Sequence, residues 1–382
     1  MTLKEGLEIL RGCPIKVFEG NPLDIPCIET SDAERLCKTP VVSVAMLAYK
    51  HEPFIRRAIE GVMMQQTDFE FELVVGEDGS PDKTREICFE LQKRHPDKIR
   101  VLWWHENISK FGGNGRRVRS HCRGEFIALC EGDDYWTDPL KLQKQVDAMR
   151  KNPNVGLCFT DARVLQEETG QFSDWPGAEF YEEGVIKGDD FFRRYCYGVH
   201  PEKGVGPEGF VMTASVLYRQ SVMEEARAKF DILSWRLLLG DKTRILALAS
   251  LSDVCFIREK TAVYRMNAGG AMSRHGTKIF RDSAIVKMYF AETTGLGRDL
   301  PRPISWLMVH VRRRMDDRKT DMGDEKTFRR MVVHWLEKVP FNVSALSVPD
   351  RIRLRLYLAF GWKWPYELRP KKLLKRFAKK SG

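Results

Sequence analysis

The chain has 382 residues, with 63 lysines and arginines against 53 aspartates and glutamates, and its formal net charge is +10. Hydrophobic residues make up 43% and aromatic residues 10%, which excludes an intrinsically disordered chain and predicts a folded protein of about two domains. No uncharged apolar stretch reaches the ~18 residues of a membrane-spanning helix, and the N-terminus lacks the apolar core of a secretory signal.

The nine cysteines are scattered along the chain, and none forms a C-x-x-C pair, which argues against a structural zinc site. Cys130 and Cys158 lie inside apolar runs, where an unpaired cysteine behaves as a small hydrophobic residue. The pattern predicts reduced core thiols and a cytoplasmic location.

Positive charge is concentrated at the C-terminal end. Residues 301–382 carry 21 basic against 8 acidic residues, a net charge of +13, whereas residues 1–300 have a net charge of −3. In this tail the basic residues are mixed with Leu, Phe, Trp and Tyr, which on a helix predicts binding to an anionic membrane surface, at its inner face. A solvated tail packed on the main domain is the alternative. Nucleic-acid binding is disfavoured because no nucleic-acid motif accompanies the charge.

Residues 1–39 show no strong period and are interpreted as an N-terminal extension. From residue 40, apolar β-branched runs alternate with the i, i+3, i+4 spacing of amphipathic helices. The predicted strands are 40–49, 69–80, 99–104, 124–134 and 155–164, and the predicted helices are 52–66, 82–95, 114–122 and 138–152. This alternation predicts βαβ units and an α/β fold with a mostly parallel sheet flanked by helices.

The pattern is less regular after residue 165. We expect a strand at 210–219, a helix at 221–230, a glycine-interrupted helix at 234–250, a strand pair within 254–266 and a mobile loop at 268–277. Long helical patterns dominate beyond that loop. The predicted domains are therefore the extension, a main α/β domain at 40–275 and a helical basic C-terminal region at 276–382.

Polar clusters follow four of the predicted strands: AYKHE, GEDGS, WWHEN and EGDD. Because ligands bind at the carboxyl ends of parallel strands, these clusters predict one site at one edge of the sheet. In EGDD, Glu131, Asp133 and Asp134 repel one another, and a divalent cation would neutralise them. Carboxylate oxygens suit Mg²⁺ or Mn²⁺. A solvated acidic turn or a helix cap is the alternative.

Three further segments suggest ligand binding. In GEDGS, Glu77 and Asp78 can accept hydrogen bonds from a base or a ribose, although a plain Asp-Gly turn needs no ligand. KFGGNGRRVR joins glycines, which allow close backbone approach, to arginines, which bind diphosphate. Asp241 interrupts an apolar helical segment, where it acts either as a general base or as a helix cap.

These segments, in this order, resemble family 2 glycosyltransferases of the GT-A fold, of the type that assembles bacterial surface polysaccharides. The matching pieces are AYKHE, GEDGS, the Gly/Arg loop, EGDDYWTDPLKLQKQ, Asp241 and YRMNAGGAMS. The resemblance covers residues 40–275 and implies a GT-A (Rossmann-like) domain. It also implies a nucleotide-diphosphate sugar donor, with a UDP-sugar favoured, and a glycan or lipid-linked acceptor.

The resemblance also implies roles for individual residues. Asp241 would deprotonate the acceptor hydroxyl, in an inverting displacement that adds one sugar. Asp133 and Asp134 would hold Mn²⁺ or Mg²⁺, Asp133 also contacting the donor. The other implied donor-binding residues are Ala48, Tyr49, Glu52, Glu77, Asp78, Arg116 and Arg117. There are two alternatives. A nucleotidyltransferase should carry a glycine-rich basic signature near the opening strand. A non-enzymatic basic protein that binds membranes or nucleic acid leaves the acidic strand ends unexplained.

Overall fold

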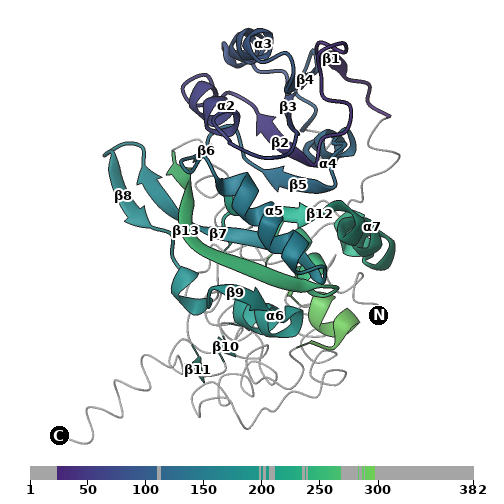
Figure 1. Cartoon of the computed structure of the whole chain (residues 1–382), viewed down its shortest axis with the longest axis vertical. Coiled ribbons are helices and arrows are strands. Elements are labelled where there is room, and N and C mark those ends of the chain that lie inside the picture. Colours follow the sequence, from purple (N-terminus) through teal and green to yellow (C-terminus); the bar gives the residue numbers. More distant parts are fainter. Residues whose placement is uncertain are drawn as a thin grey trace, which may run out of the picture. The chain divides into compact units, whose positions relative to one another are not determined.

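The structure, a computed structural model, describes residues 24–296 except 110–112, 198, 201–203, 206–210, 235–236, 238–239, 268–282, 284–285 and 288 (Figure 1). By its internal contacts the chain divides into one unit of residues 17–275 and another of residues 1–16 and 276–382. The predicted loop at 268–277 and the basic tail lie outside the described residues, so attachment to a membrane stays a prediction. No described helix has both the length and the apolar composition needed to cross a membrane.

Parallel strands form the first half of the sheet, as predicted. They are β2 (Val42–Ala48), β3 (Phe71–Glu77), β4 (Ile99–Trp103) and β5 (Phe126–Leu129). β3 lies between β2 and β4, and β5 pairs with the other side of β2, all in parallel register. The connecting helices are also confirmed and are α2 (Ile55–Met63), α3 (Thr84–Arg94), α4 (Asn114–Ser120) and α5 (Lys141–Lys151). Every residue of β3 is buried, which explains its nearly continuous apolar run.

The second half of the sheet joins the first through one short antiparallel strand. β12 (Leu217–Arg219) pairs with β5 on one side and with β7 (Val155–Gln166) on the other. β7 then pairs in parallel with β13 (Asp253–Met266). Short antiparallel strands line the borders of the unit: β1 (Ile28–Thr30), β6 (Tyr135–Trp136), β8 (Gln171–Asp174) and β9 (Gly184–Ile186). β10 (Val199–His200) and β11 (Gly204–Val205) form a separate pair. The predicted N-terminal extension thus supplies the edge strand β1 next to β4.

Two predictions for this half are wrong in detail. The strand expected at 210–219 is a 3₁₀ turn, η3 (Thr213–Ser215), followed by β12, because both the amide and the hydroxyl of Ser215 donate to the carbonyl of Met212. The strand pair expected within 254–266 is the single strand β13. Its exposed charged residues 258–260 resemble a turn, but they mark a shift in register between Ile257 and Lys260 rather than a reversal.

Besides the short 3₁₀ helix η2 (Ala178–Phe180), the described part of the unit contains further helical elements. They are α6 (Gly188–Tyr197), α7 (Gln220–Lys229), the 3₁₀ helix η4 (Asp231–Ser234) and α8 (Gly240–Ala249). The helix predicted at 221–230 is therefore confirmed as α7. The helix predicted at 234–250 begins only at Gly240, so Asp241 lies in the first turn of α8 rather than in a helix interior.

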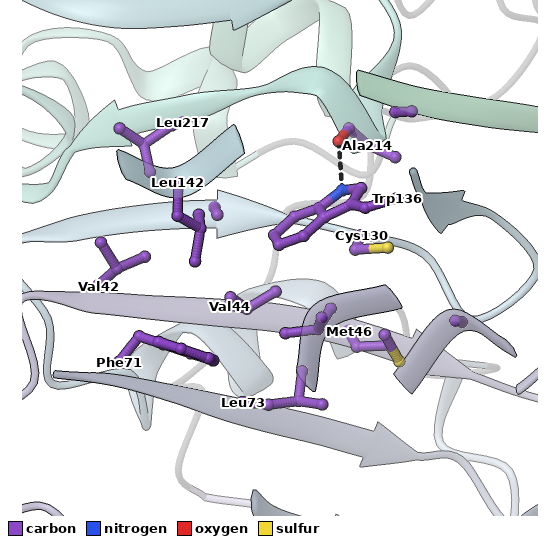
Figure 2. Packing of buried hydrophobic residues seen from close by; sticks show 14 of the residues in the cluster. Val42, Val44, Met46, Phe71, Leu73, Cys130, Trp136, Leu142, Ala214 and Leu217 are labelled. Atoms are coloured by element: carbon purple, nitrogen blue, oxygen red, sulfur yellow. Dashed lines mark hydrogen bonds between the residues drawn. The ribbon is translucent and has the colours of Figure 1, made fainter. Parts of the chain in front are cut away.

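One hydrophobic core extends under both halves of the sheet. Figure 2 shows Val42 and Val44 of β2 on one side of this core and Leu217 of β12 on the other. Between them the indole of Trp136 donates a 2.7 Å hydrogen bond from Nε1 to the carbonyl oxygen of Ala214. Burial of each large apolar side chain contributes about 1.5–3 kcal/mol. Because the core is shared, the strand ends of the two halves are held in fixed positions relative to one another.

A buried ion network anchors the border formed by β1, β3 and β4. Glu72 is fully buried, and its Oε2 accepts hydrogen bonds from Nη2 of Arg123 at 2.6 Å and from Nη1 of Arg100 at 3.2 Å. Ser43 donates to Oε1 at 2.6 Å, and Arg100 also pairs with Glu29 of β1. Burial alone would raise the pKa of Glu72, but Arg123, Ser43 and Arg100 together lower it.

Glu72→Ala is expected to destabilise the fold by about 3–5 kcal/mol, because Arg100 and Arg123 would lose a buried counter-charge. Urea unfolding followed by circular dichroism measures the change. Glu90→Ala, which removes an exposed partner of Arg56, serves as the control and should have little effect. Because the pKa of Glu72 is lowered on folding, its contribution is present at neutral pH and is lost as the pH falls below 4.5, the ordinary value. A loss no larger than that of the control would contradict a stabilising network.

Candidate active site

The loops that follow β2 and β3 are tied together by reciprocal hydrogen bonds. The carbonyl of Ala48, the last residue of β2, accepts a 2.9 Å bond from the amide of Asp78. Glu52 accepts from the amide of Lys83 at 3.1 Å, and its own amide donates to Asp82 at 3.3 Å. Tyr49 is half-buried in the same loop. The structure thus places Ala48, Tyr49 and Glu52 at one strand end, but the carboxylate of Glu52 has a protein partner there.

Glu77 and Asp78 have different environments at the end of β3. Glu77 is fully buried, and its two oxygens accept from the amide of Ser80 at 2.6 Å and from Nε of Arg85 at 2.5 Å. Asp78 accepts from the amides of Ile108 at 2.7 Å and Ser109 at 3.2 Å, and also from the hydroxyl of Ser109. Burial raises the pKa of Asp78 in spite of these bonds. Within the described residues Asp78 has no cationic partner, so it is better suited than Glu77 to a ligand.

The EGDD turn follows β5 and is held against the end of β2. The amide of Gly132 donates to the carbonyl of Leu47 at 2.9 Å, and a Cβ at this position would lie 2.7 Å from Nδ1 of His51. Only glycine therefore fits at position 132, between Glu131 and Asp133. Oδ2 of Asp133 accepts from Nδ2 of Asn267 at 3.3 Å and lies 3.9 Å from Nε2 of His51. Oδ1 of the buried Asp134 accepts from the amide of Arg265 at 3.0 Å.

Negative charge accumulates in this turn. Burial, followed by the charge of Asp133, raises the pKa of Glu131 to about 7 and raises that of Asp134 well above its ordinary value. Oδ2 of Asp134 makes no hydrogen bond within the described residues. The described residues include no group of three or more His, Cys, Asp or Glu side chains able to hold an ion by themselves. The described residues therefore show no complete metal site at this turn.

Asp241 lies in the same electrostatic environment, although it is more than a hundred residues away along the chain. Oδ2 accepts a 3.5 Å hydrogen bond from the hydroxyl of Thr213 in η3. The charge of Asp241 acts on Glu131. Burial and the charges of Asp134, Asp133 and Asp241 raise the pKa of Tyr264 to about 12. The charges of these three aspartates thus all act on one side chain, that of Tyr264, and their roles in a single site stay a prediction.

Arg116 and Arg117 lie on α4, which packs against β2 and β3. Burial and then the charge of Arg227 lower the pKa of Arg116, so this side chain lies near α7. Arg117 is half-buried. Both arginines are placed in the unit that carries the acidic turn.

Sequence reasoning missed several residues of this site. His51 and Tyr264 lie inside segments that were singled out, and their proximity to the acids was the missing information. Thr213 opens the 3₁₀ turn η3, which was expected to be part of a strand. Arg119 lies in the glycine- and arginine-rich segment that was singled out, but only Arg116 and Arg117 were named from it. The remaining residues gave no signal in the sequence because their role depends on contacts between distant elements: Asp82, Ser109, Arg227 and Arg244.

A separate cavity of about 470 Å³ is not lined by any residue of the predicted site. It lies between α2, β6, β7, β8 and β13, and its lining residues are Arg57, Tyr135, Thr137, Arg163, Phe172, Lys260 and Val263. Since it includes none of the site carboxylates, it does not contribute to the arrangement at the strand ends.

A largely parallel sheet with carboxylates gathered at its strand ends is the arrangement of a GT-A glycosyltransferase, and comparison with known proteins agrees. The family model described as "Glycosyl transferase family 2" matches residues 43–200. The chain belongs to this family and is a glycosyltransferase. The family predicted from the sequence is therefore confirmed.

Particular relatives extend the likeness beyond the matched segment. An uncharacterized protein of Mycobacterium tuberculosis is 30% identical over 328 residues, which cover 85% of this chain and 84% of the relative. An uncharacterized glycosyltransferase of Nostoc sp. is 25% identical over 307 residues, covering 77% and 88% of the two chains. The crystal structure of S. aureus TarS 1–349 in complex with UDP-GlcNAc has a TM-score of 0.62 at 15% identity and covers 88% of this chain and 92% of that one. The predicted fold is thereby confirmed.

Proposed function

We propose that the protein is an inverting, metal-dependent enzyme that moves one sugar from a nucleotide-diphosphate sugar to a glycan or lipid-linked acceptor in the assembly of bacterial surface polysaccharides. The observation that carries this proposal is that the charges of Asp133, Asp134 and Asp241 all act on Tyr264, with Asp134 hydrogen-bonded to the strand that carries this tyrosine. A UDP-sugar is the favoured donor, since the TarS structure of the same fold holds UDP-GlcNAc. Family membership argues against the nucleotidyltransferase and non-enzymatic alternatives.

The metal would be Mn²⁺ or Mg²⁺, held by Asp133 and the free oxygen of Asp134, and when bound it would stabilise the negative charge of the leaving diphosphate. Asp133 is the more accessible of the two acids, with 24% of its side chain exposed. Asp134 keeps one oxygen on the backbone of β13 and so fixes the turn. Asn267 and His51 restrict the rotation of Asp133.

The remaining site residues bind the donor and accept the proton. Asp78 would accept a hydrogen bond from the base of the nucleotide, while Ala48 and Tyr49 line the same strand end. Glu52 and Glu77 support this pocket through their protein partners. Asp241 would accept the proton of the acceptor hydroxyl as its oxygen attacks the anomeric carbon and the bond to the diphosphate breaks, which inverts that carbon. Thr213 holds one oxygen of Asp241.

A thermal-shift panel tests donor and metal together. UDP-, GDP-, CDP- and TDP-sugars are each added with Mn²⁺, with Mg²⁺ and with EDTA. One nucleotide class is expected to raise the melting temperature only when metal is present, with about 2.7 kcal/mol of stabilisation at a hundredfold excess over Kd. Equal shifts in EDTA would overturn the metal dependence, and the absence of a shift with every donor would overturn the donor assignment.

A further inference from the structure

Four arginines from three helices gather beside β12. Arg116 and Arg119 come from α4, Arg227 from α7 and Arg244 from α8; we call them the arginine cluster. α7 packs against both α8 and β12, and α4 packs against β2 and β3. The charges of Arg119, Arg227 and Arg244 all act on the buried Tyr218 of β12. Arg227 also acts on Arg116.

The cluster lacks counter-charges in direct contact. All four side chains are half-buried, and within the described residues none of them makes a hydrogen bond or an ion pair. Among the described residues, Nε of Arg119 and the hydroxyl of Tyr218 are buried without a hydrogen-bond partner. Arg100 and Arg123, by contrast, each bind the carboxylate of Glu72. Burial and then the charge of Arg244 lower the pKa of Arg119 to about 9, which shows how poorly this cation is neutralised.

Space for the cluster is built into α4. A Cβ on Gly115 would lie 2.8 Å from Nη1 of Arg119, so the glycine leaves room for that guanidinium. Keeping half-buried cations together without bound carboxylates costs stability. Planar guanidinium groups with free N–H donors are suited to the oxygens of a phosphate, which would supply the missing partners and the missing charge.

The cluster includes a residue of the helix that carries the candidate base. Arg244 follows Asp241 by three residues, so both occupy the same face of α8. The charge of Glu131 acts on both Arg119 and Arg244. In the proposed function the donor diphosphate would lie at Asp133 and its cation, so the cluster is left for a second phosphate.

From this arrangement we propose that the arginine cluster binds a phosphate group of the acceptor, so that the acceptor is a phosphate-bearing glycan or lipid rather than a neutral sugar. This inference rests on the proposed function, since it takes Asp241 as the base. The bound phosphate would anchor the acceptor with its hydroxyl near Asp241. No bond of the phosphate itself changes during sugar transfer.

The test measures anion binding apart from catalysis. Inorganic phosphate and pyrophosphate are titrated into the full chain in EDTA by calorimetry, because removal of the metal disables the proposed donor diphosphate site. Wild type is expected to bind, and Arg119→Gln combined with Arg244→Gln is expected to weaken binding about tenfold or more. Binding should also weaken as salt rises. Arg163→Gln, which removes an exposed arginine outside the cluster, is the matched control and should bind like wild type.

Two further readouts separate the outcomes. The melting temperature of the double variant without ligand should equal or exceed that of wild type, because like charges are removed; Arg244→Gln alone repeats the test if the double variant fails to fold. Binding of the nucleoside diphosphate with Mn²⁺ should stay within about twofold. A parallel loss of nucleotide binding would assign the cluster to the donor and overturn the proposal. Unchanged phosphate binding, or an equal loss in Arg163→Gln, would also overturn it. A failed donor panel with intact phosphate binding would instead count against the proposed function alone.

Discussion

Asp241→Asn is expected to lower the rate of sugar transfer by about 10²- to 10⁴-fold, the range that a positioned general base contributes. The substitution keeps the size of the side chain and its contact with Thr213, but an amide does not accept a proton from the acceptor hydroxyl. Donor binding should change little, because the predicted nucleotide contacts lie at the ends of β2 and β3. Single-turnover sugar transfer, measured beside calorimetric donor binding, separates the two effects.

Asp189→Asn is the matched control for this experiment. Asp189 also lies in the first turn of a helix, α6, but its partner is Arg193 on the surface, at 3.2 Å. Transfer by this variant should resemble that of wild type. Transfer near the wild-type rate in Asp241→Asn would instead point to Glu131 as the base, since its pKa of about 7 also suits proton transfer. Glu131→Gln would then show the loss that Asp241→Asn lacks.

The first half of the fold was predictable because its signals are local. The run through Val42–Ala48 is apolar and β-branched, and the spacing of apolar residues in Ile55–Met63 gives one buried helix face. Each strand end carries acids, and parallel topology alone brings such ends to one edge of the sheet. The gathering of Asp78, Asp133 and Asp134 in one unit followed from that rule.

The second half depended on contacts that no local pattern records. β12 has three residues and inserts antiparallel between β5 and β7, and its flanking sequence resembles a longer strand. The charged residues inside β13 resemble a turn. The partners of Glu72 lie 28 and 51 residues away in sequence, and the arginine cluster joins three helices. Such pairings are set by tertiary packing, which overrides local preference.

The second large effect is expected at Asp133. Asp133→Asn should weaken metal-dependent nucleotide binding by about 100-fold or more, because the cation loses its most accessible charged ligand. The amide of the substituted asparagine is close in size to the native carboxylate, so the substitution should fit beside Asn267 without changing the packing of the turn. Calorimetric titration of nucleoside diphosphate with and without Mn²⁺ measures the loss, and only the metal-dependent part of the affinity should disappear.

Asp147→Asn is the control for Asp133, since its carboxylate lies on the exposed side of α5 and accepts only from Gln143 among the described residues. The pH dependence of metal-dependent nucleotide binding offers an independent check. The pKa of Glu131 is raised to about 7, so Glu131 takes up a proton as the pH falls through that value and a negative charge beside the cation is lost; metal-dependent binding in wild type should therefore weaken below neutrality. Equal nucleotide affinity in Asp133→Asn and wild type would contradict a cation site at the EGDD turn. It would also contradict the proposed path of the leaving diphosphate.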